Sequence, residues 1–276
     1  MKKALLLILL FLFQFSYGQD SIIALNEVTV NKSAEKDIKN IIKKIKKNLK
    51  RNYESNTKEF SVKQIAILDK SDTLININRI YSFDIKSLDN NFSIKLVENK
   101  DNQFYRNKAF FDTYEEHSDS PEHWISESLI RKNLDIERFD FFNTLSDYQF
   151  LIKTEGHLIT VQFTSDEYYS GYFIYDKNNY NLHHISFSNS KPYPFTASLS
   201  ANGKNKVFKK WNYNTEEVTI QFTENNQNQI AIKSIICTVE IDDYYFEKYN
   251  KKGAIIKKEG PLQFYSFLKI EAITAE

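Results

Sequence analysis

The apolar residues between Ser33 and Tyr53 recur with the period of an α-helix. Positions i, i+3, i+4, i+7 and i+11 form one stripe: Ile38, Ile41, Ile42, Ile45 and Leu49. Ser33 is suited to cap the first turn, and Lys50 and Arg51 lie in the last turn, where positive charge complements the helix dipole. The pattern predicts an amphipathic helix whose remaining surface is rich in lysine.

After this helix the apolar period changes to two, which is typical of β-strands. The stretch "FSVKQIAILDKSDTLININRIYSFDI" predicts two strands joined around Asp69–Asp72, and "NFSIKLVEN" predicts a third. From Asp147 onward seven more strands are expected: "YQFLIKTEG", "LITVQFTS", "YSGYFIYDKNN", "NLHHISFS", "EEVTIQFTENN", "IAIKSIICTVEI" and "LQFYSFLKIEAI". Turns rich in Asn and Asp separate them, so we expect neighbouring strands to pair antiparallel.

The middle of the chain departs from the β pattern. A polar, acidic stretch at 99–121 is expected to form a mobile insert, and short helices are expected at Pro121–Asn133 and Ile136–Leu145. The predicted fold class is α+β: a large curved antiparallel sheet, half-barrel-like, with an N-terminal amphipathic helix and short mid-chain helices packed on it. Residues 33–276 then form a single domain.

The N-terminus "MKKALLLILLFLFQFSYG" has the layout of a secretory signal peptide. Lys2 and Lys3 precede an apolar run, and small residues Ser16 and Gly18 precede the expected cleavage site. The run is too short to span a bilayer as a helix, although an uncleaved anchor is an alternative. We therefore expect a signal peptide at 1–18, an extended connector at 19–32 and no transmembrane helix after cleavage. The predicted location is the periplasm, the outer membrane surface or the exterior.

The charge balance and the cysteine content argue against a nucleic-acid-binding protein and exclude an intrachain disulfide. The chain has 37 basic and 36 acidic residues, and this near-neutral balance argues against a nucleic-acid partner. Cys237 is the only cysteine, so an intrachain disulfide is impossible. It lies in the apolar run "IAIKSIICTVEI", where a buried, inert thiol is expected.

The densest polar cluster, "YEEHSDSPEHW", supplies weak metal-ligand candidates in His117, Glu122 and His123. Their spacing matches neither the helical zinc motif nor a paired-cysteine pattern, so a solvated acidic loop is the favoured interpretation. His183 and His184 are adjacent in a predicted strand. Their side chains then point to opposite faces and cannot bind one ion together.

Motifs for catalysis are missing from the sequence. There is no G-x-S-x-G elbow, since Ser170 stands beside Gly171 without that pattern, and no glycine-rich phosphate loop. The sequence therefore predicts no catalytic residue and no cofactor. A hydrolase with an unrecognised site remains an alternative.

The basic helix itself allows two interpretations. A basic amphipathic helix can lie on an anionic membrane surface. Its apolar stripe, however, holds only Ile and Leu, without Trp or Phe, and one such stripe is also what a helix packed on a sheet requires. We favour packing on the sheet.

The segment 25–63 resembles a segment of secreted Bacteroidota proteins described as carboxypeptidase-regulatory-like-domain-containing. In those proteins an L-x-E-V-x-V tract precedes an amphipathic helix, an Asn-Tyr pair and a strand. The matching residues here are Leu25, Glu27, Val28, Val30, Ile41, Ile42, Lys44, Asn52 and Tyr53. The first strand departs from the family, because it reads "FSVKQIAILD" in place of a Phe-Tyr-Arg-Glu run.

A second block, 139–188, is similar to a later part of the same family, where a phenylalanine-rich turn leads into aromatic strands. Its matching residues are Phe141, Phe142, Tyr148, Phe150, Val161, Phe163, Gly171, Phe173, Tyr175, Asp176 and Tyr180. The resemblance implies an exported envelope protein and leaves the chemistry open. The order of elements also resembles the open half-barrels of LolA-like lipoprotein carriers, at the level of fold alone.

Together these features predict an exported cell-envelope protein that binds a lipid or apolar ligand without catalysis. The first alternative is a structural or accessory interaction protein of the outer membrane, which recognises an envelope protein through an exposed sheet edge. The second alternative is the hydrolase.

Overall fold

The computed structural model describes residues 28–29, 32–53, 57–69, 72–85, 92–104, 136, 139–201 and 205–273. The expected signal peptide at 1–18 and most of the connector lie outside the described residues, as does the expected helix Pro121–Asn133. Within the described residues, no helix is both long and apolar enough to cross a bilayer.

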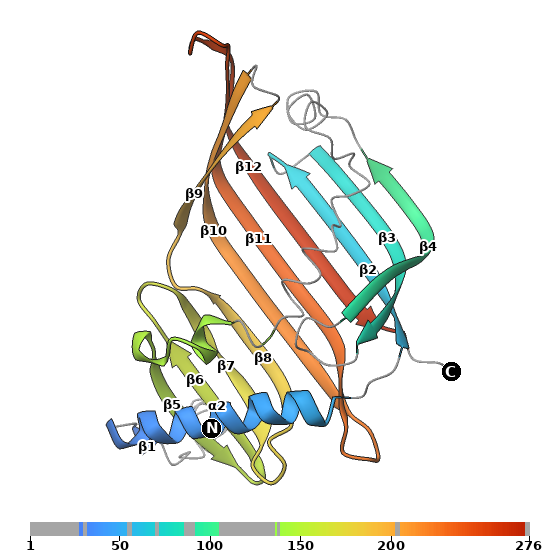
Figure 1. Cartoon of the computed structure of the whole chain (residues 1–276), viewed down its shortest axis with the longest axis vertical. Coiled ribbons are helices and arrows are strands. Elements are labelled where there is room, and N and C mark those ends of the chain that lie inside the picture. Colours follow the sequence, from blue (N-terminus) through green and yellow to red (C-terminus); the bar gives the residue numbers. More distant parts are fainter. Residues whose placement is uncertain are drawn as a thin grey trace, which may run out of the picture.

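One twelve-stranded sheet dominates the structure (Figure 1). The strands are β1 (Val28–Thr29), β2 (Thr57–Leu68), β3 (Asp72–Ile85), β4 (Phe92–Phe104), β5 (Gln149–Glu155), β6 (Leu158–Thr164), β7 (Tyr169–Asp176), β8 (Leu182–Asn189), β9 (Tyr193–Ala201), β10 (Asn205–Glu224), β11 (Ile230–Tyr249) and β12 (Ile255–Ala272). Eleven of them follow the order β1-β5-β6-β7-β8-β10-β11-β12-β2-β3-β4, and β9 pairs with β10. All these strand pairs are antiparallel, as expected for consecutive strands joined by short turns. The sheet is open, with β1 and β4 at its two ends.

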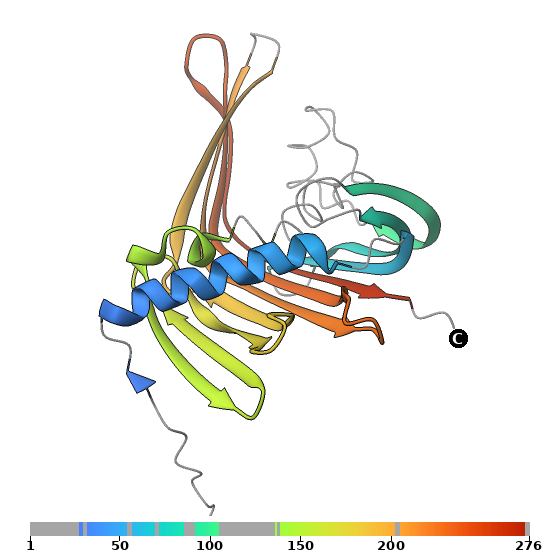
Figure 2. The ribbon, with the colours of Figure 1, turned by 60° about the horizontal axis from the view of Figure 1, so that its bottom comes forward.

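The single described α-helix, α2 (Lys32–Arg51), confirms the helix predicted from the 3.6-residue period. Ile38, Ile42, Ile45 and Leu49 are buried in one core with the sheet, whereas Lys39, Lys43, Lys44, Lys47 and Lys50 are exposed. The helix therefore packs on the sheet and uses its apolar stripe there. Figure 2 shows α2 lying across one face of the strands.

Hydrogen bonds fix the C-terminal end of α2 on the sheet. The side chain of Asn48 donates to the Oδ1 atom of Asn181, which is fully buried, and Asn181 Nδ2 donates to the carbonyl of Asn228 at 3.0 Å. At the helix end, the Ile230 amide donates to the Asn52 carbonyl at 2.9 Å. The helix is thus tied to the β7–β8 turn and to the turn before β11.

The expectation of several α-helices is not confirmed. In place of an α-helix over Ile136–Leu145, the structure has short 3₁₀ turns at Asp140–Phe142 and Leu145–Asp147. Asn143 Nδ2 donates to the Phe139 carbonyl at 3.0 Å, and Thr144 Oγ1 donates to the Asp140 carbonyl at 3.0 Å. Such side-chain bonds to the backbone compete with helix formation, and aromatic residues are weak helix formers.

The phenylalanines of this segment close one end of the core. Phe141 stacks on Phe163 of β6 with ring centroids 4.1 Å apart, and Phe142 meets Phe173 of β7 edge-on at 5.2 Å. Phe139 packs against Phe187 of β8 at 5.0 Å. Over β6, β7 and β8 the face of the sheet that carries α2 is therefore filled by the protein's own side chains. We call it the core face, and the opposite face the outer face.

Three strands continue beyond this core as a projection that we call the finger. It comprises β9 with residues 205–213 of β10, and residues 244–249 of β11 with residues 255–262 of β12. In Figures 1 and 2 these segments extend away from α2 and β5–β8 as two joined hairpins. Because β10, β11 and β12 run through both parts, the finger is continuous with the rest of the sheet.

Candidate functional site

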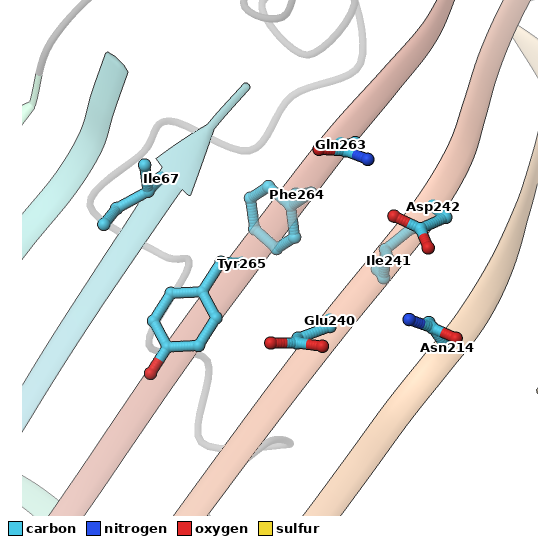
Figure 3. Close-up of a pocket in the computed structure, with 8 residues that line it drawn as sticks. All are labelled: Ile67, Asn214, Glu240, Ile241, Asp242, Gln263, Phe264 and Tyr265. Atoms are coloured by element: carbon cyan, nitrogen blue, oxygen red, sulfur yellow. The ribbon is translucent and has the colours of Figure 1, made fainter. Parts of the chain in front are cut away.

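A pocket of about 380 Å³ lies where the finger joins the main sheet (Figure 3). Four strands contribute its described lining: Ile67 from β2, Asn214 from β10, Glu240, Ile241 and Asp242 from β11, and Gln263, Phe264 and Tyr265 from β12. This volume falls within the range of small-ligand sites.

The strand register shows on which face of the sheet the side chains that line the pocket lie. Glu240 lies opposite Tyr265, and Tyr265 lies opposite Ile67, so these three side chains share one face of the sheet. The neighbouring pair Ile241 and Phe264 points to the other face and packs against the core. The Glu240–Tyr265–Ile67 row therefore belongs to the outer face, and Figure 3 shows it side by side on three strands.

Irregular pairing at the base of the finger produces the hollow. The β10–β11 register shifts between Tyr213 and Thr215, and the β11–β12 register shifts between Ile241 and Tyr244. Asp243, within the second shift, has a φ of 52°. Such bulges bend a strand and redirect its side chains. Both register shifts fall at or next to residues that line the pocket, Asn214, Ile241 and Asp242.

The backbone around the pocket is held from two directions. The Gln263 amide donates to Asp69 Oδ1 at 3.0 Å, and the Asp69 amide donates to the Gln263 carbonyl at 2.9 Å. On the other side, Asn189 Nδ2 donates to the Asn214 carbonyl at 3.1 Å. The lining residues are therefore positioned by bonds that do not use their own side chains.

The described lining combines carboxylates with an apolar surface. Glu240 and Asp242 carry negative charge, Asn214 and Gln263 add amide groups, and none of the described lining residues is cationic. Tyr265 and Ile67 supply an aromatic ring and an aliphatic side chain. A ligand would bind favourably with a cationic or hydrogen-bond-donating group beside the carboxylates and an apolar group beside Tyr265. The described lining has no histidine, cysteine, serine or threonine to act as a nucleophile or its base.

A second polar cluster lies at the crossover from β8 to β9. Glu216, 4% exposed, accepts hydrogen bonds from the Tyr193 hydroxyl at 2.7 Å and from the Tyr169 hydroxyl at 3.2 Å. Burial, and then the adjacent Glu216 carboxylate, raise the pKa of both tyrosines well above the usual range. The phenols therefore stay protonated as donors. This cluster joins strands and is enclosed, so its role is structural.

The sequence-predicted metal candidates His117, Glu122 and His123 lie outside the described residues. Among the residues that are described, no group of three or more His, Cys, Asp or Glu side chains is placed to hold a metal ion. His184 stacks on Tyr172 with ring centroids 5.2 Å apart, and burial lowers its pKa. Its Nε2 lies 3.1 Å from the Tyr172 hydroxyl.

Cys237 and Ser170, which the sequence analysis also considered, lie in surroundings that give them no catalytic partner among the described residues. Cys237 is a buried free thiol, as expected from its apolar strand. The Ser170 hydroxyl lies 2.6 Å from the Ser190 hydroxyl, and this contact contains no side chain that could act as a general base. Neither residue gains a catalytic partner within the described part of the chain.

Sequence reasoning did not find the pocket, because its residues come from strands far apart in the chain and meet only through register. One local signal exists: the pair Asp242–Asp243 interrupts an otherwise apolar and aromatic strand. Two adjacent carboxylates there mark the bulge. No protein-family model matches this chain, and no curated protein matches its sequence.

Proposed function

We propose that this protein is an exported, non-catalytic binding protein of the cell envelope, and that the outer-face pocket takes an amphipathic ligand. The apolar part of the ligand lies against Tyr265 and Ile67, and its cationic or hydrogen-bond-donating group faces Glu240 and Asp242. The observation that carries the proposal is the Glu240–Tyr265–Ile67 row, which places charge, aromatic ring and aliphatic side chain side by side.

Several features support the wider proposal. Export rests on the signal-like residues 1–18, and on the resemblance to secreted Bacteroidota proteins. A half-barrel-like curvature of the open sheet would suit a carrier, as in the LolA-like analogy. Because side chains fill the core face over β6, β7 and β8, we place the binding site on the outer face instead of inside the curve. On the outer face the apolar side chains of Ile67 and Tyr265 are half-buried.

Calorimetry with three twelve-carbon amphiphiles tests the pocket. We expect the mature chain to bind dodecyltrimethylammonium, below its micelle concentration, at least about tenfold more tightly than dodecanoate, with neutral dodecyl maltoside between them. Glu240→Gln should remove this preference, and Tyr265→Ala should weaken binding of all three. Glu155→Gln is the matched control, since Glu155 is an exposed carboxylate at the end of β5. Equal binding of the three head groups, or unchanged binding by Glu240→Gln, would refute the proposal.

The native ligand can be sought directly. Native mass spectrometry of protein taken from its host envelope should reveal a bound amphiphile, which the Tyr265→Ala protein should lose. Protein that carries no such species, and that also binds none of the three probes, would contradict the binding function.

The accessory-protein alternative rests on the β4 edge. β4 pairs with β3 alone among the described strands, and its adjacent Leu96 and Val97 are 45% and 50% exposed. An open edge with apolar side chains can add a strand from another chain. Val97→Pro should then abolish recovery of an envelope protein by cross-linking, whereas Lys100→Ala, at an exposed position of the same strand, should not. The alternative fails if the two variants recover the same proteins.

A further inference from the structure

The finger carries an excess of positive charge equal to that of α2, which has nine basic and two acidic residues. Residues 193–213 and 244–262 contain nine lysines and two glutamates, in a chain whose formal net charge is +1. The remainder of the molecule is therefore acidic on balance. A projection with this charge is attracted to anionic surfaces.

The tip of the finger adds exposed apolar side chains to this charge. The β11–β12 turn, residues 250–254, presents Lys251 and Lys252, both exposed. Directly after it, Ile255 and Ile256 are 51% and 54% exposed, the two most exposed large apolar side chains of the described residues. Lys257 and Lys258 follow at once.

The local backbone accounts for the exposure of Ile256. The β11–β12 register shifts between Lys248 and Tyr249, where Tyr249 pairs with Ile255 and Lys248 pairs with Lys257. Ile256 is thus an extra residue, a bulge that redirects its side chain. The turn itself is well ordered by hydrogen bonds: Asn250 Oδ1 accepts from the Lys252 and Ala254 amides at 2.9 and 3.0 Å. An ordered turn therefore presents two adjacent isoleucines between two pairs of lysines.

The position of the tip makes it accessible to a flat surface. In Figures 1 and 2 the β11–β12 hairpin reaches the end of the finger, away from α2 and the main sheet. The lysines of α2 differ from those of the tip in one respect: the apolar stripe of α2 is buried in the core, so that helix has no apolar side chains to insert. β4 also exposes an apolar pair, Leu96 and Val97, but the exposed, acidic Glu98 follows that pair directly, whereas two lysines follow the isoleucines of the tip.

We propose that the tip of the β11–β12 hairpin docks on an anionic lipid bilayer. Ile255 and Ile256 enter the interface between headgroups and acyl chains, and Lys251, Lys252 and Lys258 contact the lipid phosphates. The charge of the finger matches an anionic surface, and the isoleucine pair is surrounded by cations as in interfacial membrane segments. This inference uses no part of the outer-face pocket and goes beyond the proposed ligand binding.

Vesicle flotation tests the docking. We expect the mature chain to bind phosphatidylglycerol–phosphatidylcholine vesicles, to bind pure phosphatidylcholine vesicles at least about tenfold more weakly, and to dissociate at high salt because surface charges are then screened. The double variant Lys251→Glu with Lys252→Glu should lower binding at least about 25-fold, since each lysine near an anionic surface contributes about fivefold. The double variant Ile255→Ser with Ile256→Ser should lower it at least about tenfold.

Two matched variants serve as controls. Leu96→Ser with Val97→Ser removes an adjacent exposed apolar pair from β4, and Lys43→Glu with Lys47→Glu reverses the charge of two exposed lysines of α2. Both should bind anionic vesicles like the unaltered chain. All of these side chains are exposed, and circular dichroism with urea unfolding verifies that each variant is folded. The proposal is overturned if the unaltered chain does not bind anionic vesicles, if the tip variants bind normally, or if the α2 variant alone loses binding.

Discussion

The hydroxyl of Tyr193 donates a 2.7 Å hydrogen bond to the buried carboxylate of Glu216 at the point where β9 replaces β8 beside β10. The Glu216 amide donates to Asn189 Oδ1 at 2.6 Å, so both the side chain and the backbone of Glu216 are bound to the crossover. This contact joins the finger to the main sheet.

Tyr193→Phe should lower the free energy of unfolding by about 2 kcal/mol, because the buried carboxylate loses its shorter donor. Urea denaturation followed by circular dichroism measures the change. Tyr168→Phe is the matched control: Tyr168 is 46% exposed, so its hydroxyl exchanges freely with water and the change should be near zero. Equal effects of the two substitutions would mean that the Glu216 contact contributes nothing particular.

Alkaline pH should destabilise the protein. Burial raises the pKa of Tyr175 to about 12, and burial together with Glu216 raises the pKa of Tyr169 and Tyr193. An unfolded tyrosine has a pKa of about 10, so the folded state holds more protons above that pH. The protonated side chains of these tyrosines therefore contribute their full stabilisation below pH 10, and this contribution is lost as the pH rises toward 12 and beyond.

The measurement is the absorbance of tyrosinate at 295 nm, with urea midpoints at several pH values. At pH 11 the folded chain should have ionised fewer of its 17 tyrosines than the urea-unfolded chain. The urea midpoint should fall between pH 9 and 11. Coincident titrations of the folded and unfolded chains would rule out the raised pKa values.

Asn181→Ala should release α2 from the β7–β8 turn and that turn from the β10–β11 turn. The side chain of Asn181 is the partner of both Asn48 and the Asn228 carbonyl, and the residue is 0% exposed. We expect a loss of about 2 kcal/mol, because buried partners are left without hydrogen bonds. Asn226→Ala, at an exposed turn position, should change stability by less than about 0.5 kcal/mol. A near-neutral Asn181→Ala would show that the packing of α2 does not depend on this contact.

Gly171→Ala should disrupt the β7–β8 pair. A Cβ atom at this position would lie 2.1 Å from the Ser186 carbonyl oxygen and 2.7 Å from the Phe187 Cα, and backbone atoms of a paired strand cannot move aside. We expect a loss of about 3 kcal/mol from this overpacking. At Gly156, a Cβ meets no atom within 4 Å but φ is 61°, so Gly156→Ala should cost only about 1 kcal/mol. The reverse order of stability, measured in urea, would contradict the steric argument.

The helix and the main strands were predictable because each has one buried face. The stripe of Ile38, Ile42, Ile45 and Leu49 marked α2, and alternating apolar residues marked the strands that cover the core. Toward the tip of the finger the strands have no buried face, and the adjacent Ile255 and Ile256 are both exposed, so apolar and polar side chains do not alternate there. The sequence therefore predicted only the core-facing parts of β10, β11 and β12, and β9, which contains Pro194, was not predicted.

The pocket was not predictable for a different reason. Ile67 and Glu240 come together only because β12 lies between β2 and β11, and that order depends on long-range pairing. The crossover cluster of Tyr193 and Glu216 likewise depends on β9 taking the place of β8. Local patterns carry information about a buried face, and they carry little about which strands become neighbours.

Because β12 runs from the tip of the finger to the pocket, it sets the distance between these two sites. Ten residues separate Tyr265 in the pocket from Ile255 at the tip, which corresponds to roughly 30 Å of extended chain. If the tip rests on a bilayer with the finger upright, the pocket stands well beyond the lipid headgroups. It would then meet ligands that have already left the membrane, or segments of proteins that protrude from it, and not lipids still within the bilayer.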